Sequence, residues 1–291
     1  MFQFFANIFG YLLDFINNIV GNYGLAIILF TIVIKLIMLP LSIKQQKTMK
    51  KSTKLQEKMK VLQFKYKNDP DKLNREMMDL YKQENMSPFS GCLSAIFQFI
   101  LLISIFYMVR YPLTYMEGFE KNQLDTYITQ MKNDGKPINE AYSEIDIVRE
   151  IDYLREKFPE DEKLKSVNLN MNFFGLDLSK IPQQNLGDWT VYIIPILYII
   201  STFISMRITT SMQKKPKENK DVIDITEKKE EEEKNEMETA MEQSNKMMSW
   251  MMPIMSVSIS LVAPLGLALY WLVNNILMIG ERLVLDKVLK D

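Results

Sequence analysis

Apolar residues occur in long blocks along this chain, and blocks rich in charged residues separate them. Each apolar block is close to the length of about 20 residues that crosses a bilayer as a helix. The pattern predicts an all-α polytopic membrane protein. Its five transmembrane helices are expected over residues 22–43, 87–110, 189–207, 247–262 and 264–285.

Residues 1–21 form an apolar segment of a different kind. Its polar positions recur every three or four residues, at Gln3, Asn7, Gly10, Asp14, Asn17, Asn18 and Gly21. A helix with this spacing carries one polar stripe on an apolar surface, which predicts an amphipathic helix lying in the membrane interface. An additional spanning helix is the alternative.

The charged blocks predict how the spans are oriented. Lys44–Lys82 holds twelve Lys and Arg against five Asp and Glu, and a turn signal at residues 68–70 divides it into two amphipathic helices. By the positive-inside rule, residues 44–86 form a cytoplasmic helical hairpin. Alternation then places the N-terminus and an extracytoplasmic subdomain, residues 111–188, outside. The charged loop 208–246 and the tail 286–291 lie in the cytoplasm, in a bacterial plasma membrane protein.

Lys35 is a charged residue inside the first predicted span. Insertion scales give a cost of at least ~2.5 kcal/mol for such a residue, so it is by default a functional candidate. Snorkelling to the interface is the alternative. Lys44, the nearest flanking cation, lies nine residues further on, roughly 13 Å along a helix. A lysine stem covers only part of that distance, which favours a role for Lys35 in lining a cavity.

Other polar residues also interrupt the apolar blocks. Thr31 shares a helix face with Lys35 because residues four apart lie on the same side. The remaining candidates are Ser94 and Gln98, Ser201 and Ser205, and Asn275. They favour the predicted cytoplasmic halves, which indicates a shared hydrophilic groove that binds substrate. The alternative is close helix packing, where membrane proteins often place serine and threonine.

Composition argues against enzymatic chemistry. The chain has no histidine and one cysteine, Cys92, so the commonest general base and the usual zinc ligand are missing. An intramembrane protease would need an activated nucleophile, and Lys35 beside Thr31 or Ser94 lacks any supporting motif. We therefore expect no catalytic residue, cofactor, metal or direct nucleic-acid ligand.

Several motifs resemble the YidC family of membrane protein insertases, in its Gram-positive-like form. They are Asn22-Tyr23-Gly24-Leu25, Leu39-Pro40-Leu41, Tyr66-Lys67-Asn68-Asp69-Pro70, Ser87-Pro88-Phe89-Ser90-Gly91-Cys92-Leu93 and Pro264-Leu265-Gly266-Leu267-Ala268-Leu269-Tyr270-Trp271. The resemblance implies a five-helix core with a cytoplasm-open groove that inserts small membrane proteins without nucleotide hydrolysis. It also implies that Trp271 lies near the groove's substrate contacts.

Two departures from the family pattern concern charge. Lys35 stands where the family usually has arginine, which keeps the positive charge but loses bidentate binding of a carboxylate. Glu281-Arg282 stands where the family often has paired glutamines. The expected partners are nascent membrane proteins and the lipid bilayer. The Sec translocon, the ribosome and the signal-recognition-particle receptor are candidate partners of the hairpin.

Two functions remain open at this point. In the first, an insertase, a nascent hydrophobic segment slides along the groove while Lys35 attracts acidic residues in its polar flank. In the second, a small transporter or channel, Lys35 binds an anionic solute. A conducting path would need polar residues through the outer halves of the spans, and those halves are mostly apolar, which favours the insertase.

Overall fold

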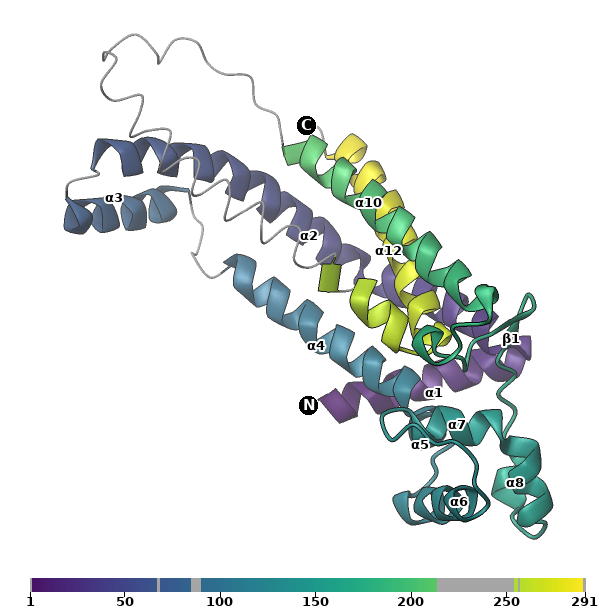
Figure 1. Ribbon diagram of the computed structural model, residues 1–291. Coiled ribbons are helices and arrows are strands. Elements are labelled where there is room, and N and C mark those ends of the chain that lie inside the picture. Colours follow the sequence, from purple (N-terminus) through teal and green to yellow (C-terminus); the bar gives the residue numbers. More distant parts are fainter. Residues whose placement is uncertain (1, 67–68, 85–89, 214–253, 256, 290–291) are drawn as a thin grey trace. The chain divides into compact units, whose positions relative to one another are not determined.

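The computed structural model describes residues 2–66, 69–84, 90–213, 254–255 and 257–289. These residues are mostly helical, and the one sheet among them has two strands (Figure 1). The chain forms two compact units, residues 1–179 with 276–291 and residues 180–275. The helical content agrees with the predicted all-α class.

Three helical segments of the described chain are long and apolar enough to cross a membrane. They are Tyr23–Thr48, Trp189–Ser211 and Leu265–Val288. Helix α4 (Ser90–Arg110) contains a shorter apolar stretch, Phe99–Arg110. The predicted span 247–262 and the predicted tail 286–291 lie partly outside the described residues. Most of the predicted loop 208–246 also lies outside them. The arrangement of five spans stays a prediction.

The first predicted span is part of one long helix, α2 (Tyr23–Lys65, 43 residues). Asn22 caps its start, since the Asn22 side chain accepts a hydrogen bond of 3.1 Å from the Leu25 amide. The predicted span, residues 22–43, forms only the first half of this helix, which continues through Pro40 to Lys65.

Helix α3 (Pro70–Gln83) follows after the turn. The Asp69 side chain caps it by accepting from the Lys72 amide at 3.0 Å, and Pro70 occupies a first-turn position where its missing N–H costs nothing. Helix α3 lies beside the distal part of α2 (Figure 1), where Lys58 forms an ion pair with Glu84. Residues 67–68 and 85–86 of the predicted hairpin lie outside the described chain.

Helix α1 (Phe2–Val20) packs against α2, α4 and the short helix α5 (Pro112–Tyr115). Gly10 makes the contact with α5 possible, because a Cβ at this position would lie 2.1 Å from the Tyr115 carbonyl oxygen. Asn17 is also buried and donates to the Asn168 carbonyl at 2.9 Å. Two members of the predicted polar stripe, Gly10 and Asn17, therefore serve packing.

The outward face of α1 is apolar. Phe4, Tyr11, Phe15 and Ile19 are 64%, 72%, 63% and 68% exposed, and their spacing of seven, four and four residues places them on one side of the helix. A face of this kind suits contact with lipid.

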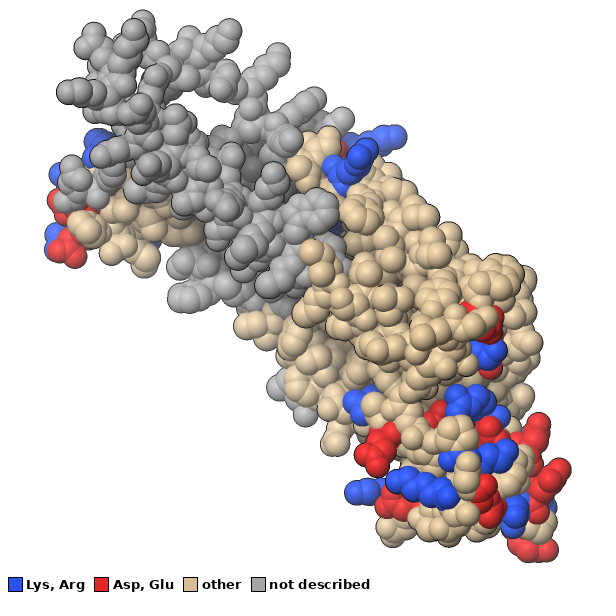
Figure 2. All heavy atoms as spheres, viewed as in Figure 1, with Lys and Arg blue, Asp and Glu red and all other residues tan. Residues whose placement is uncertain are grey.

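The segment after α4 folds into short helices around its own apolar core. After α5 come α6 (Lys121–Asn133), α7 (Ser143–Arg149), α8 (Ile151–Lys157) and α9 (Glu162–Ser166), then strands β1 (Asn172–Phe173) and β2 (Leu176–Asp177). Phe119, Tyr127 and Phe158 form consecutive edge-to-face ring contacts with centroids 6.1 and 5.3 Å apart. Charged side chains gather over the helices of this segment, whereas the surface over α10 is mostly uncharged (Figure 2).

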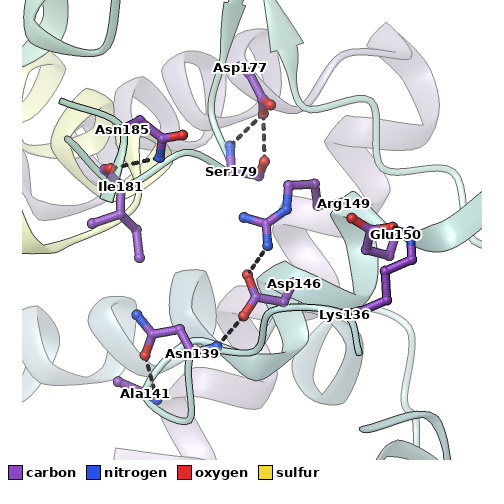
Figure 3. A network of polar contacts seen from close by, with 10 residues as sticks. All are labelled: Lys136, Asn139, Ala141, Asp146, Arg149, Glu150, Asp177, Ser179, Ile181 and Asn185. Carbon is purple, nitrogen blue, oxygen red and sulfur yellow. Dashed lines mark hydrogen bonds and ion pairs between the residues drawn. The ribbon is translucent and has the colours of Figure 1, made fainter. Parts of the chain in front are cut away.

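Polar contacts tie α7 to the loop before it. Asp146 accepts from the Asn139 amide at 2.6 Å and pairs with Arg149 at 2.7 Å, while Lys136 pairs with Glu150 at 2.8 Å (Figure 3). Asp146 is buried, and burial raises the pKa of its carboxyl group above the ordinary value.

Glu144 is the second buried carboxyl group of α7. It accepts from the Thr114 amide at 2.9 Å and from the Thr114 hydroxyl at 2.5 Å. These hydrogen bonds favour the charged form, but burial outweighs them and raises the pKa of Glu144 to about 7.

The second unit contains two 3₁₀ turns, η1 (Pro182–Gln184) and η2 (Trp189–Tyr192), helix α10 (Ile193–Gln213) and the beginning of α12 (Leu265–Val288). The Asp188 side chain caps η2 by accepting from the Thr190 amide at 3.0 Å. Helix α10 passes Arg207, where the third span was predicted to end, and continues to Gln213. Thr209 and Thr210 in this extension donate their hydroxyl groups to carbonyl oxygens one turn earlier, as helical residues do.

Candidate functional site

Lys35 lies in the apolar part of α2 and forms an ion pair with Glu281 of α12. Its ammonium nitrogen is 3.5 Å from Glu281 Oε2, and the two side chains are 22% and 14% exposed. Both residues belong to the same compact unit. Charges inside a membrane protein typically pair with one another because an unpaired charge is costly there, so Glu281 offsets part of the cost of burying Lys35.

The Glu281 carboxylate is only half satisfied. Its second oxygen, Oε1, is buried and has no hydrogen-bond partner among the described residues. A buried acceptor without a donor costs about 1–3 kcal/mol, and such a group in a native structure calls for an explanation. The pair therefore combines a cation held by one oxygen with a second oxygen that can still accept.

A second ion pair connects the same two helices. Lys50 Nζ lies 3.3 Å from Asp286 and donates to the Leu289 carbonyl at 3.2 Å. The two side chains of this second pair are more exposed than those of the first pair, at 38% for Lys50 and 32% for Asp286. Exposed ion pairs contribute about 0–1 kcal/mol to the free energy of folding. The second pair therefore aligns the two helices more than it stabilises the fold.

Thr31 lies one turn before Lys35 and is almost fully buried. Its hydroxyl donates to the Ile27 carbonyl of the same helix at 2.6 Å. The Thr31 hydroxyl is thus satisfied within its own helix, which is the usual arrangement for a threonine in a transmembrane helix. Ser94 and Gln98 were predicted at the same groove, but their side chains lie outside the described part of α4.

The second unit brings together other predicted site residues. The Asn275 amide donates to the Ser201 hydroxyl at 3.0 Å and to the Thr202 hydroxyl at 3.2 Å. Ser201 in turn donates to the Tyr198 carbonyl at 2.8 Å. These bonds connect α10 with the first part of α12, and Asn275 and Ser201 are both buried.

Trp271 packs in the same unit one turn before Asn275. Its ring lies 6.1 Å from the Tyr198 ring with an angle of 34° between the planes. Ser205 is 7% exposed. Hydrogen bonds between polar residues therefore hold α10 and α12 together in this unit. Thr202 and Tyr198 take part in this contact, although neither was predicted as a site residue.

Sequence reasoning did not identify Glu281 as the partner of Lys35. A signal was present, because Glu281 is the first acidic residue after the long apolar run of α12 and departs from the family pattern at that position. Buried charges are usually paired, so a lysine and a glutamate in two apolar helices of one chain are candidates for pairing.

Comparison with known proteins agrees with the motifs. A family model described as 60Kd inner membrane protein matches residues 15–291. The chain belongs to the 60Kd inner membrane protein family. The chain is also similar to proteins named Membrane protein insertase YidC, which confirms the resemblance seen in the motifs.

Two YidC relatives show how far the similarity extends. The chain is 46% identical over 104 residues to the protein of Caldanaerobacter subterraneus subsp. tengcongensis, which is 35% of this chain and 50% of the relative. It is 44% identical over 109 residues to the protein of Francisella tularensis subsp. novicida, which is 38% of this chain and 20% of the relative. The matches thus span half or less of each relative. With its apolar helices, this member of the YidC family is a multi-pass membrane protein.

Proposed function

We propose that this chain is a membrane protein insertase, in which hydrophobic segments of nascent proteins enter the bilayer along a hydrophilic groove that includes Lys35. The observation that carries the proposal is the Lys35–Glu281 pair inside two helices long and apolar enough to span a membrane. A site of this kind gives the polar flank of a substrate an alternative to hydrocarbon. The names of the YidC relatives support the same activity.

The mechanism uses the partial exposure of Lys35. An ammonium group in a low-dielectric setting attracts a carboxylate more strongly than it would in water. An acidic residue in the translocated flank is drawn partway into the membrane, and burial of the adjacent apolar segment then contributes about 25 cal/mol per Å². The membrane potential acts on the charges of the flank in addition.

The remaining predicted groove residues have supporting roles. Thr31, Ser94, Gln98, Ser201, Ser205, Trp271 and Asn275 complete the groove wall in this proposal. The bonds of Asn275 with Ser201 and Thr202 hold α10 and α12 in contact, which supports a role in shaping the wall more than in touching substrate directly.

The topology follows from charge. In this proposal the N-terminus and residues 111–188 lie outside, α1 lies in the outer interface, and α3 with the distal part of α2 forms a cytoplasmic hairpin. The basic excess in Lys44–Lys82 supports this orientation. Nascent chains are the substrate, and the Sec translocon, the ribosome or the signal-recognition-particle receptor is a partner for the hairpin.

Insertion assays with substitutions at Lys35 test the proposal. The purified chain in proteoliposomes is given a single-span reporter whose translocated flank carries either three Asp or three Asn residues, and insertion is measured by protease protection. We expect Lys35→Ala to slow insertion of the acidic reporter more than the neutral one, and Lys35→Arg to preserve both. Equal insertion of both reporters by the wild-type chain and Lys35→Ala would refute the attraction mechanism. Uptake of an anionic solute without any reporter insertion would instead support a transporter.

A further inference from the structure

We infer that Glu281 determines the charge selectivity of the Lys35 site, by competing with acidic substrate flanks for Lys35 and by accepting donors from basic flanks. The inference rests on the proposed insertase function and assigns a specificity-determining residue to it. It follows from the geometry of the pair rather than from Lys35 alone, because Glu281 offsets part of the positive charge of Lys35 that a passing chain would meet.

The distance between the two groups indicates a pair that a substrate can exchange. The 3.5 Å separation of Lys35 Nζ and Glu281 Oε2 is longer than the about 2.7–2.9 Å of a strong charge-assisted hydrogen bond. An incoming carboxylate that reaches Lys35 replaces one Lys–carboxylate contact with another. The net gain for an acidic flank is therefore the difference between two similar interactions, much smaller than a lone lysine would give.

The unpartnered oxygen of Glu281 gives the pair a second capacity. Glu281 Oε1 is buried without a hydrogen-bond partner among the described residues. The Glu281 side chain as a whole is 14% exposed, so a turn of its carboxylate that brings Oε1 to the surface would let a substrate donor, such as a lysine ammonium or a backbone N–H, remove the cost of that orphaned acceptor. Basic and neutral flanks thus gain an interaction that a site with Lys35 alone would deny them.

Together these features predict a site that tolerates flanks of either charge. If Glu281 loses its charge, the site becomes more cationic, because Lys35 and the neighbouring Arg282 then have no acidic counterpart at position 281. Acidic flanks then gain affinity and basic flanks lose it. The selectivity between flanks, rather than the overall insertion rate, is the quantity that Glu281 controls.

The test uses three reporters that differ only in the translocated flank, with three Asp, three Asn or three Lys residues. Full-length wild-type chain, Glu281→Gln and Glu281→Asp are compared in proteoliposomes. Asp286→Asn is the matched control, because Asp286 is an acidic residue of the same helix that pairs with Lys50 and not with Lys35. Thermal unfolding of each variant is measured alongside to show that it is folded.

For Glu281→Gln we expect the ratio of acidic to neutral insertion to rise about fivefold and the ratio of basic to neutral insertion to fall about fivefold, as for an interaction of modest strength. Glu281→Asp, which keeps the charge, should retain the wild-type order of the flanks, and Asp286→Asn should leave both ratios unchanged. Folded Glu281→Gln with wild-type ratios would overturn the inference while leaving the insertase function intact. Failure of the wild-type chain to insert any reporter would refute the proposed function and this inference with it.

Discussion

Lys35 and Glu281 form an ion pair with 3.5 Å between nitrogen and oxygen, each on a helix that is long and apolar enough to cross a membrane. The pair joins parts of the chain that lie almost 250 residues apart in sequence, on α2 and α12. It changes the description of Lys35 from an isolated cation to half of a partly exposed pair. In the proposed function, acidic residues of a substrate would therefore meet a site that already holds a carboxylate.

Removing one partner of the pair should destabilise the chain more than removing both. Loss of one partner from a fully buried pair costs about 3–5 kcal/mol, and for side chains that are 22% and 14% exposed we expect about 2 kcal/mol for Lys35→Ala. The double variant Lys35→Ala with Glu281→Ala should recover part of this loss. Thermal unfolding in detergent of the wild-type chain, the two single variants and the double variant provides a double-mutant cycle. Purely additive effects on stability would mean that the two charges do not interact.

Gly10 should be intolerant of any side chain. A Cβ at this position would lie 2.1 Å from the Tyr115 carbonyl oxygen, so Gly10→Ala must push α1 away from α5. Overpacking of this kind typically destabilises the folded state by about 1–3 kcal/mol. The matched control is Gly280→Ala, since no atom lies within 4 Å of a Cβ there. An unfolding temperature for Gly10→Ala that is no lower than that of Gly280→Ala would contradict the observed contact.

Glu144 should make stability depend on pH in the direction opposite to most carboxyl groups. Its pKa is raised from 4.5 to about 7 in the folded chain, mainly by burial, so the folded state binds a proton more tightly than the unfolded state does. The contribution of Glu144 to stability is therefore greatest below about pH 4.5 and falls as the pH rises towards about 7, by up to about 3 kcal/mol.

Unfolding temperatures measured from pH 4.5 to pH 8 check this dependence. Glu144→Gln keeps a neutral group of similar size beside Thr114 and should be less sensitive to pH than the wild-type chain over this window. Asp146 also has a raised pKa, so the difference between the two proteins is the informative quantity. If their pH profiles run parallel, Glu144 does not titrate in this range.

The hairpin can be removed without touching the pair. Because α2 is continuous to Lys65 and Lys50 contacts α12, a deletion that began at Lys44 would damage the core. Replacing residues 58–84 with a short Gly and Ser linker removes α3 and the distal part of α2 only. We expect insertion to slow while the unfolding temperature stays within a few degrees of wild type. Insertion at the wild-type rate would exclude the hairpin from the mechanism.

The sequence predicts local features well and contacts between distant helices poorly. The position of Lys35 in a span follows from the apolar run around it, and the turn before α3 follows from Asp69 and Pro70. The pairing of Lys35 with Glu281 depends on how α2 and α12 pack, which no local pattern specifies. Gly10 shows the same limit: it looks like part of a polar stripe, but its role is a close approach to the backbone of Tyr115.

Helix ends were similarly hard to predict. Pro40 signals an end in a soluble helix, where water can satisfy free backbone groups. In an apolar span the helix continues because those groups have no other partner. Helix α10 likewise continues beyond the predicted span 189–207, since polar residues such as Thr209 remain helical by bonding to their own backbone.

Photo-crosslinking to a stalled nascent chain tests the central claim, substrate contact at the Lys35 site, most directly. A crosslinker at Ser42 lies on the same face of α2 as Lys35, seven residues away, and leaves Lys35 in place; a crosslinker at Ile37, on the opposite face, is the control. The account predicts a crosslink from position 42 to the polar flank of the substrate that weakens when Lys35 is changed to Ala, and little crosslinking from position 37. Equal crosslinking from both positions, unaffected by Lys35→Ala, would contradict it.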